Sequence, residues 1–179
     1  MALETRSVND EVLRHLGIAQ GERILEIGFG HGRTLERAAR GAPLATFAGI
    51  DHAPDMEAAL RRRGADLIES GRLELRVADS TRLPWSNGSF DAAFAVHTIY
   101  FWPDLRRQFG EVARVLRRGG RLAVGFRERS PESEAAVPAA IYRLRSKEEV
   151  LAALAESGFE ARTTAGPGQG IWVVDGTTK

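Results

Sequence analysis

The feature that most constrains the fold of this chain is a glycine-rich turn between an apolar segment and an amphipathic one. Residues 23–27 have the pattern of a short buried strand, and residues 34–40 have that of a helix. Gly28, Gly30 and Gly32 stand at alternate positions between them. Glycine allows tight turns and close approach of a ligand to the backbone, and a helix N-terminus offers free N–H groups and the positive end of a dipole. A plain strand-to-helix connection needs one glycine at most, so the three together predict a ligand-binding turn.

Short apolar segments alternate with amphipathic ones along the whole chain, which is typical of α/β layer proteins. The length of 179 residues fits a single domain, residues 1–179. We predict a doubly wound α/β fold with a seven-stranded, mostly parallel sheet and an antiparallel last strand. Helical crossovers are expected between the first five strands and a hairpin between the last two, because residues 165–170 are too few for a crossover. The expected strands are residues 23–27, 46–50, 72–77, 90–96, 121–126, 159–164 and 171–175. The expected helices are residues 7–17, 34–40, 54–70, 104–116 and 146–157.

Local signals mark the limits of the last predicted helix. Ser146 is a good N-cap, and Glu149 three residues later completes the pattern of a capping box. The preceding residues, 127–145, contain two prolines and are expected to be irregular.

Composition excludes several classes of protein. The formal net charge of +1 lacks the strong basic excess of a dedicated nucleic-acid binder. The absence of cysteine rules out disulfides, thiolate metal sites and cysteine nucleophiles. No apolar stretch approaches the roughly 20 residues that a membrane span needs, and residues 1–9 lack the pattern of a secretory signal. We expect a cytoplasmic protein, monomeric or homodimeric, that acts on a small molecule and binds no nucleic acid.

The glycine pattern discriminates between two nucleotide-binding motifs. The dinucleotide fingerprint G-x-G-x-x-G requires a glycine at position 33, where this chain has Arg33. Its third glycine stands one place earlier, at Gly32, and Glu26 precedes the first glycine by two residues. The resulting pattern, E-x-G-x-G-x-G, resembles motif I of the class I S-adenosylmethionine-dependent methyltransferases. A nicotinamide-dependent oxidoreductase, which shares the sheet and an acid after the second strand, is the less favoured alternative.

Four further features resemble that family in order and spacing. Asp51 ends the second expected strand, and Asp79 follows the third. Residues 83–91, with Leu-Pro-Trp and Ser-Phe-Asp, resemble the family's loop into the fourth strand, and residues 116–122 resemble its turn into the fifth. The resemblance extends over roughly residues 8–175. It is closest to the type 11 small-molecule group, which contains the ubiquinone and menaquinone C-methyltransferases.

The resemblance implies a Rossmann-like methyltransferase fold with S-adenosyl-L-methionine as cofactor, S-adenosyl-L-homocysteine as product, and no metal. It places Asp51 at the ribose hydroxyls and Asp79 near the adenine amino group. Glu26 stands in an apolar strand, where a carboxylate is costly unless it is hydrogen-bonded. We expect it to orient the glycine turn and, directly or through water, the amino group of the cofactor. The expected cofactor-binding residues are Glu26, Gly28, Gly30, His31, Gly32, Asp51, His52, Asp79, Ser80 and His97.

Methyl transfer from a sulfonium is an in-line displacement, so alignment and exclusion of water are the main tasks of the protein. The end of the fourth strand should face the methyl group. His97 is the one residue there that titrates near neutral pH, which makes it the candidate catalytic residue. It is expected to be a general base or a hydrogen-bonding partner of cofactor or substrate, and a purely structural role is the alternative. Tyr100, Phe101 and Trp102 either wall a pocket for a flat or apolar substrate or pack in the core.

The absence of two motifs limits the classes of methyl acceptor that we expect. The [DN]-P-P-[YF] motif of amino-group methylases is missing after the fourth strand, and no acid ends that strand as in magnesium-dependent catechol methylation. We predict methyl transfer to an O, N or C atom of a small molecule, mainly by proximity and alignment. A non-catalytic binding or regulatory protein of the same fold is the alternative. Few residues remain to cover the site, so an open pocket, a lid or a second subunit is expected.

Overall fold

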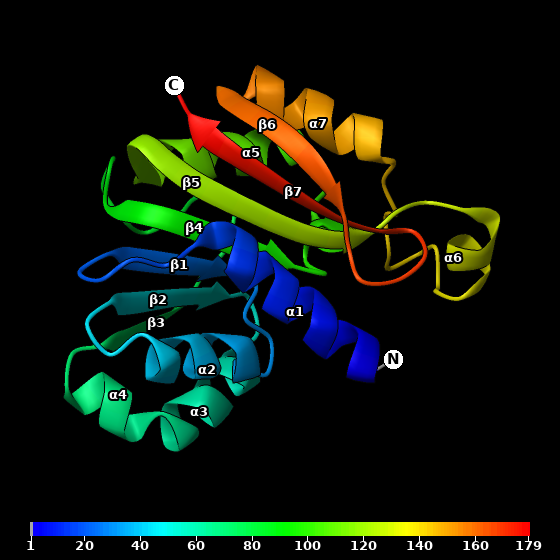
Figure 1. Ribbon diagram of the computed structural model, residues 1–179. Helices are drawn as coiled ribbons and strands as arrows, with labels where there is room; N and C mark the ends of the chain where they lie inside the picture. Colours follow the sequence, from blue (N-terminus) through cyan, green and yellow to red (C-terminus); the bar gives the residue numbers. More distant parts are fainter. Residues whose placement is uncertain (1) are drawn as a thin grey trace.

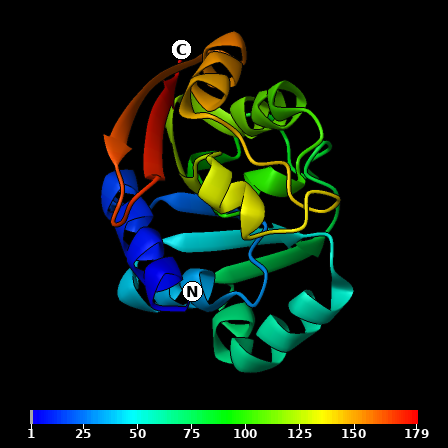
Figure 2. The ribbon, with the colours of Figure 1, turned by 90° about the vertical axis from the view of Figure 1, so that its right-hand side faces the viewer.

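The computed structural model describes residues 2–179, which form one seven-stranded sheet with helices on both faces (Figures 1 and 2). The strand order is β3-β2-β1-β4-β5-β7-β6, and β7 alone runs antiparallel to its neighbours. The strands are β1 (Arg23–Ile27), β2 (Thr46–Asp51), β3 (Leu73–Val77), β4 (Phe90–Val96), β5 (Leu116–Arg127), β6 (Phe159–Ala165) and β7 (Ile171–Thr178). The helices are α1 (Ala2–Leu16), α2 (Arg33–Gly41), α3 (Pro54–Arg63), α4 (Ala65–Glu69), the 3-10 turn η1 (Ile99–Phe101), α5 (Leu105–Val115), α6 (Pro131–Ala135) and α7 (Lys147–Glu156). The predicted doubly wound α/β fold is confirmed.

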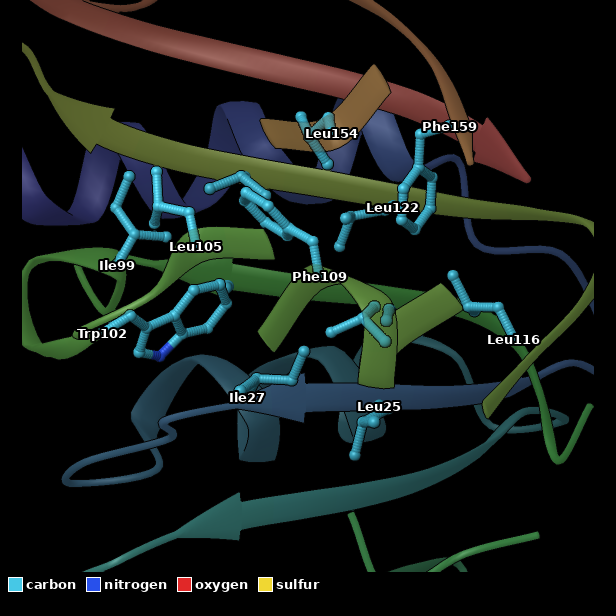
Figure 3. Packing of buried hydrophobic residues seen from close by; sticks show 14 of the residues in the cluster. Leu25, Ile27, Ile99, Trp102, Leu105, Phe109, Leu116, Leu122, Leu154 and Phe159 are labelled. Atoms are coloured by element: carbon cyan, nitrogen blue, oxygen red, sulfur yellow. The ribbon is translucent and has the colours of Figure 1, made fainter. Parts of the chain in front are cut away.

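Two apolar cores lie on opposite faces of the sheet, because successive strand side chains point to opposite sides. On one face, Leu25 and Ile27 of β1 belong to the core that includes Phe109 of α5 and Leu154 of α7 (Figure 3). On the other face, Ile24 belongs to the core formed with α1, α2, α3 and α4. The central strands are therefore buried on both sides, as parallel strands in doubly wound sheets are.

The predicted crossover between the third and fourth strands is wrong. Residues 78–89 contain no helix, and α5 holds this loop instead. Glu111 accepts a hydrogen bond from the Leu83 backbone N–H at 2.9 Å, and the Arg114 guanidinium donates to the carbonyls of Leu83 and Trp85 at 2.9 and 2.8 Å.

Several boundaries also differ from the predictions, including the start of α1 at Ala2 and the end of β7 at Thr178. The helix expected over residues 54–70 is divided at Gly64 into α3 and α4. The fifth strand begins at Leu116, because its pairing with β4 shifts register and absorbs the Gly119–Gly120 turn. The irregular residues 127–145 include the short helix α6. The capping box is confirmed: Ser146 Oγ accepts from the Glu149 N–H at 3.1 Å, and Glu149 accepts from the Ser146 N–H at 2.7 Å.

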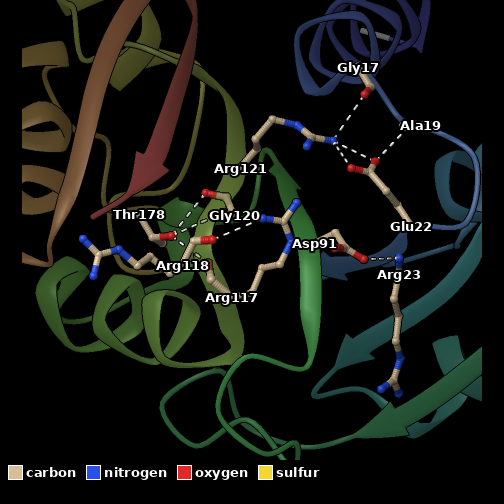
Figure 4. Close-up of polar contacts among 10 residues, drawn as sticks. All are labelled: Gly17, Ala19, Glu22, Arg23, Asp91, Arg117, Arg118, Gly120, Arg121 and Thr178. Carbon is tan, nitrogen blue, oxygen red and sulfur yellow. Dashed lines mark hydrogen bonds and ion pairs between the residues drawn. The ribbon is translucent and has the colours of Figure 1, made fainter.

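Polar contacts join the strands at the end of the sheet where the parallel strands begin (Figure 4). Asp91 at the start of β4 accepts from the Arg23 N–H of β1 at 2.8 Å and from Arg117 of β5 at 2.7 Å. Arg121 of β5 donates to both carboxylate oxygens of Glu22 at 2.8 and 2.7 Å. We call this set, Asp91, Arg23, Arg117, Arg121 and Glu22, the basal network. Within residues 2–179, no helix combines the length and apolar character that a membrane span requires.

Candidate functional site

A cavity of about 710 Å³ lies at the carboxyl ends of β1, β2 and β4. The chain leaves β1 toward β2 on one side, whereas β4 lies on the other, so the cavity stands at the topological switch point where doubly wound folds bind ligands. Its lining brings together every residue that the sequence predicts to bind the cofactor: Glu26, Gly28, Gly30, His31, Gly32, Asp51, His52, Asp79, Ser80 and His97. Their individual roles remain predictions.

The glycine turn adopts a backbone that other residues rarely take. Gly28, Gly30 and Gly32 have φ values of +75°, +49° and +68°. A side chain at Gly28 would overlap Thr98, and one at Gly32 would overlap Leu60. A Cβ at Gly30 would meet nothing within 4 Å and would project into open space beside the turn. Gly28 and Gly32 are thus required for packing, whereas Gly30 leaves room for a ligand.

Asp51 ties the end of β2 to this turn. One carboxylate oxygen accepts from the Gly30 N–H at 2.8 Å, and the other accepts from the Ala53 N–H at 3.0 Å. The residue is 8% exposed and lines the cavity. Each oxygen has two acceptor positions, so the carboxylate can also accept from the two hydroxyls of a ribose.

Glu26 carries a buried carboxylate oxygen, Oε2, that has no hydrogen-bond partner among the described residues. Burial raises the pKa of this carboxyl well above its usual range, and the nearby Asp51 carboxylate raises it further, whereas the Leu35 backbone N–H acts in the opposite direction. Because Glu26 lines the cavity, a cationic ligand group would supply the missing donor and favour the charged form.

Asp79 follows β3 and is exposed at the cavity. Its carboxylate accepts from the Thr81 N–H at 2.7 Å, and hydrogen bonds from Thr81 lower its pKa, with smaller contributions from Arg107 and His52. Asp79 is therefore ionised at neutral pH and can only accept hydrogen bonds.

His97 has a φ of +54°, the one positive φ at a non-glycine position in residues 2–179. Its Nδ1 lies 2.9 Å from the Tyr100 hydroxyl oxygen, which also accepts from the Arg127 backbone N–H at 2.5 Å. Tyr100 is 4% exposed, and burial raises the pKa of its phenol to about 12. The phenol therefore keeps its proton. We assign the tautomer in which this proton is donated to Nδ1, so that the Nε2 atom of His97 carries the imidazole proton.

The three predicted aromatic residues have different positions. Phe101 is 47% exposed, lines the cavity, and packs against Tyr142 with ring centroids 5.1 Å apart. Trp102 also lines the cavity but is buried, edge-on to Phe109. Tyr100 is not among the lining residues. We correct its assignment from pocket wall to a residue that orients His97.

Sequence reasoning missed several polar residues of the cavity, and the most buried of them is Gln108 of α5. It is 1% exposed, lines the cavity, and its Oε1 has no partner among the described residues. The available signal was an amide on the helix face that otherwise carries Leu105, Phe109 and Val112.

The cavity suits S-adenosylmethionine in chemical terms. Glu26 would hold an ammonium group, Asp51 the ribose hydroxyls, and the open face of Gly30 the chain between them. This glycine-lined cavity, in a sheet of order β3-β2-β1-β4-β5-β7-β6 with β7 antiparallel, is typical of the class I S-adenosylmethionine-dependent methyltransferase fold. Comparison with known sequences identifies the family: residues 25–124 match the Methyltransferase domain family of type 11, and the chain belongs to it.

Relatives with named activities methylate different atoms. An O-methyltransferase from Pyrenophora dematioidea is 34% identical over 122 residues, which are 68% of this chain and 45% of that protein. The ubiquinone/menaquinone biosynthesis C-methyltransferase UbiE from Geobacter sp. is 32% identical over 113 residues, which are 63% of this chain and 48% of that protein. The chain thus spans about half the length of these curated relatives.

Solved structures share the fold. A SAM-dependent methyltransferase from Aquifex aeolicus superimposes with a TM-score of 0.82 at 18% identity, over 99% of this chain and 96% of that one. At this identity the likeness shows the fold alone.

Proposed function

We propose that this chain transfers a methyl group from S-adenosylmethionine to a hydroxyl oxygen of a small molecule. The observation that carries the proposal is the meeting, in one cavity, of the glycine turn and the unpartnered Oε2 of Glu26. The named O-methyltransferase among the relatives supports oxygen as the acceptor atom. When bound, S-adenosylmethionine would supply a sulfonium methyl group; transfer to a hydroxyl oxygen would break the methyl–sulfur bond with its electron pair left on sulfur, and the hydroxyl proton would pass to solvent water.

The protein's contribution is binding and alignment. Glu26 would hold the ammonium group of the cofactor and Asp51 its ribose hydroxyls, and the buried Trp102 helps to exclude water. His97 donates a hydrogen bond from Nε2 to the acceptor oxygen and so aims a lone pair at the methyl group. Its position follows from the φ of +54° and the bond to Tyr100. The exposed ring of Phe101 favours an acceptor with an apolar or aromatic part beside the hydroxyl.

We also propose that residues 1–179 act as one domain, monomeric or homodimeric, in the cytoplasm. This reaction scheme requires no metal, because the positively charged sulfur of the cofactor is already a good leaving group. Size-exclusion chromatography with light scattering would determine the oligomeric state.

The test begins with calorimetric titration of S-adenosylhomocysteine into the purified chain. Methyl-labelled S-adenosylmethionine is then supplied with a panel of phenols, aliphatic alcohols, amines and carbon acids, and products are identified by mass spectrometry and NMR. We expect binding and O-methylation of hydroxylated, partly apolar compounds. Absence of binding at millimolar ligand contradicts the cofactor assignment, and methylation confined to nitrogen or carbon contradicts the acceptor assignment.

Two substitutions of His97 test its role in the same assay. Glycine and asparagine both tolerate positive φ, so H97G and H97N preserve the backbone. H97N keeps an N–H donor and should retain more activity than H97G, for which we expect kcat to fall about tenfold. S-adenosylhomocysteine affinity should change little in either variant. Equal losses in both variants indicate proton removal by the imidazole instead.

A further inference from the structure

Helix α5 carries a buried amide on its apolar face. Gln108 is 1% exposed and shares this face with Leu105, Phe109 and Val112, which are buried in the core. Its Oε1 is buried without a hydrogen-bond partner among the described residues. An unsatisfied buried polar atom destabilises a fold, and an apolar side chain would fill this position at less cost. The amide therefore lacks a partner among the residues that the structure describes, and a bound ligand could supply one.

The cavity is where that partner can lie, since Gln108 is among its lining residues. Neighbouring contacts place Gln108 at the Asp79 end. Glu111, one turn further along α5, accepts from the Leu83 N–H of the loop that follows Asp79. The preceding residue, Arg107, is close enough to Asp79 to help lower the pKa of that carboxyl.

The order of the strands fixes which part of an elongated ligand reaches this end. Glu26, Asp51 and Asp79 belong to or follow β1, β2 and β3, which lie side by side in that order. A ligand whose ammonium pairs with Glu26 and whose ribose meets Asp51 therefore directs its base toward Asp79 and Gln108. This step rests on the proposed function.

We propose that Gln108 is a specificity-determining residue that recognises the amino-bearing edge of adenine. A glutamine amide presents an acceptor and a donor side by side, and adenine presents a 6-amino donor beside the N1 acceptor. Asp79 offers acceptors only, so it can take the second hydrogen of the amino group but cannot donate to N1. Gln108 would thus hydrogen-bond to both the 6-amino group and N1, and Asp79 would accept the second hydrogen of the 6-amino group.

The test compares two ligands and several variants of the full chain by calorimetry. The ligands are S-adenosylhomocysteine and its analogue with purine in place of adenine, which lacks the 6-amino group. We expect the wild type to bind the analogue about tenfold more weakly. In Q108L and Q108M, which are similar in size but have no amide, that ratio of dissociation constants should fall roughly threefold or more. D79A still contains Gln108, so it should still bind the purine analogue more weakly than S-adenosylhomocysteine.

Controls separate recognition from structural damage. Q20L makes the same substitution at an exposed residue and should keep the wild-type ratio. The unliganded Q108L and Q108M proteins should unfold at the wild-type temperature or above it, because an unsatisfied polar group has been removed. A ratio unchanged in both Gln108 variants overturns this inference and leaves the proposed function standing. Failure of the wild type to bind S-adenosylhomocysteine overturns both.

Discussion

A residue that binds ligand at the cavity can lower the free energy of unfolding of the protein without ligand. Glu26 shows this best, because its carboxyl is buried, lies near Asp51, and leaves Oε2 unpartnered. Its pKa is raised in the folded state. Below the ordinary pKa of 4.5 the group is protonated in both states and has no effect. As pH rises above 4.5, the unfolded chain releases the proton first, and stability falls until the raised folded pKa is passed.

E26Q should therefore stabilise the empty protein at pH 7, by about 1–3 kcal/mol, because glutamine stays neutral. The difference should vanish near pH 4, where the wild-type carboxyl is protonated. The same variant should bind S-adenosylhomocysteine at least about tenfold more weakly, since the ammonium loses its counter-charge. Urea unfolding at both pH values and calorimetry measure the two effects. A less stable E26Q at pH 7 would contradict the assignment.

Much of the site could be predicted at this scale because its chemistry stands close together in the sequence. Glu26 and Asp51 stand at the carboxyl ends of two consecutive strands, with the three glycines between them, and the strand ends of a parallel sheet meet at one edge. Gln108 was missed because its contribution depends on which helix face meets the cavity. Tyr100 was misplaced because an aromatic residue after a strand is equally suited to a pocket or a core.

At the scale of elements, the connection between β3 and β4 depends on α5. Arg114 has one carbonyl partner at Leu83, another at Trp85, and the amide oxygen of Asn87 at 3.1 Å. Its ion pair with Glu111 holds the pKa of that carboxyl below its usual range. The loop of residues 78–89 contains no helix, and hydrogen bonds from α5 hold it in place. Asp79 belongs to this loop.

R114L should destabilise the protein by about 2–4 kcal/mol, because it leaves two backbone carbonyls without their donor and the Glu111 carboxylate without its ion-pair partner. Binding of S-adenosylhomocysteine should weaken as well. R106L is the matched control on the same helix, where a mostly exposed arginine pairs with Glu156, and it should change stability by less than about 0.5 kcal/mol. Urea unfolding compares them, and equal effects would contradict the pinning role.

Element types followed from periodicity, whereas several boundaries did not. The break at Gly64 divides a segment whose pattern is continuous, and α6 forms in a stretch whose prolines indicate irregular chain. The extension of β5 back to Leu116 arises from pairing with Phe90, which is a tertiary contact that local sequence does not encode. Ser146 and Glu149 could be predicted as a cap because that interaction is local.

Considered as a whole, the molecule separates stability from ligand binding along the strand direction. The basal network joins β1, β4 and β5 where they begin, and the cavity lies where the parallel strands end. Burial acts to raise the pKa of Asp91, but hydrogen bonds from the Arg23 N–H and Arg117 outweigh it, and its pKa lies below the usual value. Its contribution is present above pH 3.8 and is lost as pH falls through the lowered folded pKa.

D91N should lower the free energy of unfolding at pH 7 by about 1 kcal/mol, with a deficit that shrinks below pH 3. S-adenosylhomocysteine affinity should stay within twofold of wild type, since the change lies at the far end of the strands. D66N, which breaks a largely exposed pair with Arg40, should have less effect on stability. A large loss of affinity in D91N would contradict the separation.

The close packing of Thr98 against Gly28 has a consequence for how this family diversifies. The two residues lie in different halves of the fold, one after β4 and one after β1, yet a side chain at position 28 would overlap the threonine. Position 28 therefore cannot gain a side chain unless the residue at position 98 becomes smaller. Relatives that carry alanine at the first glycine of the turn should carry glycine at the position of Thr98, and substitutions at the two sites should be found paired across descendants of a common ancestor.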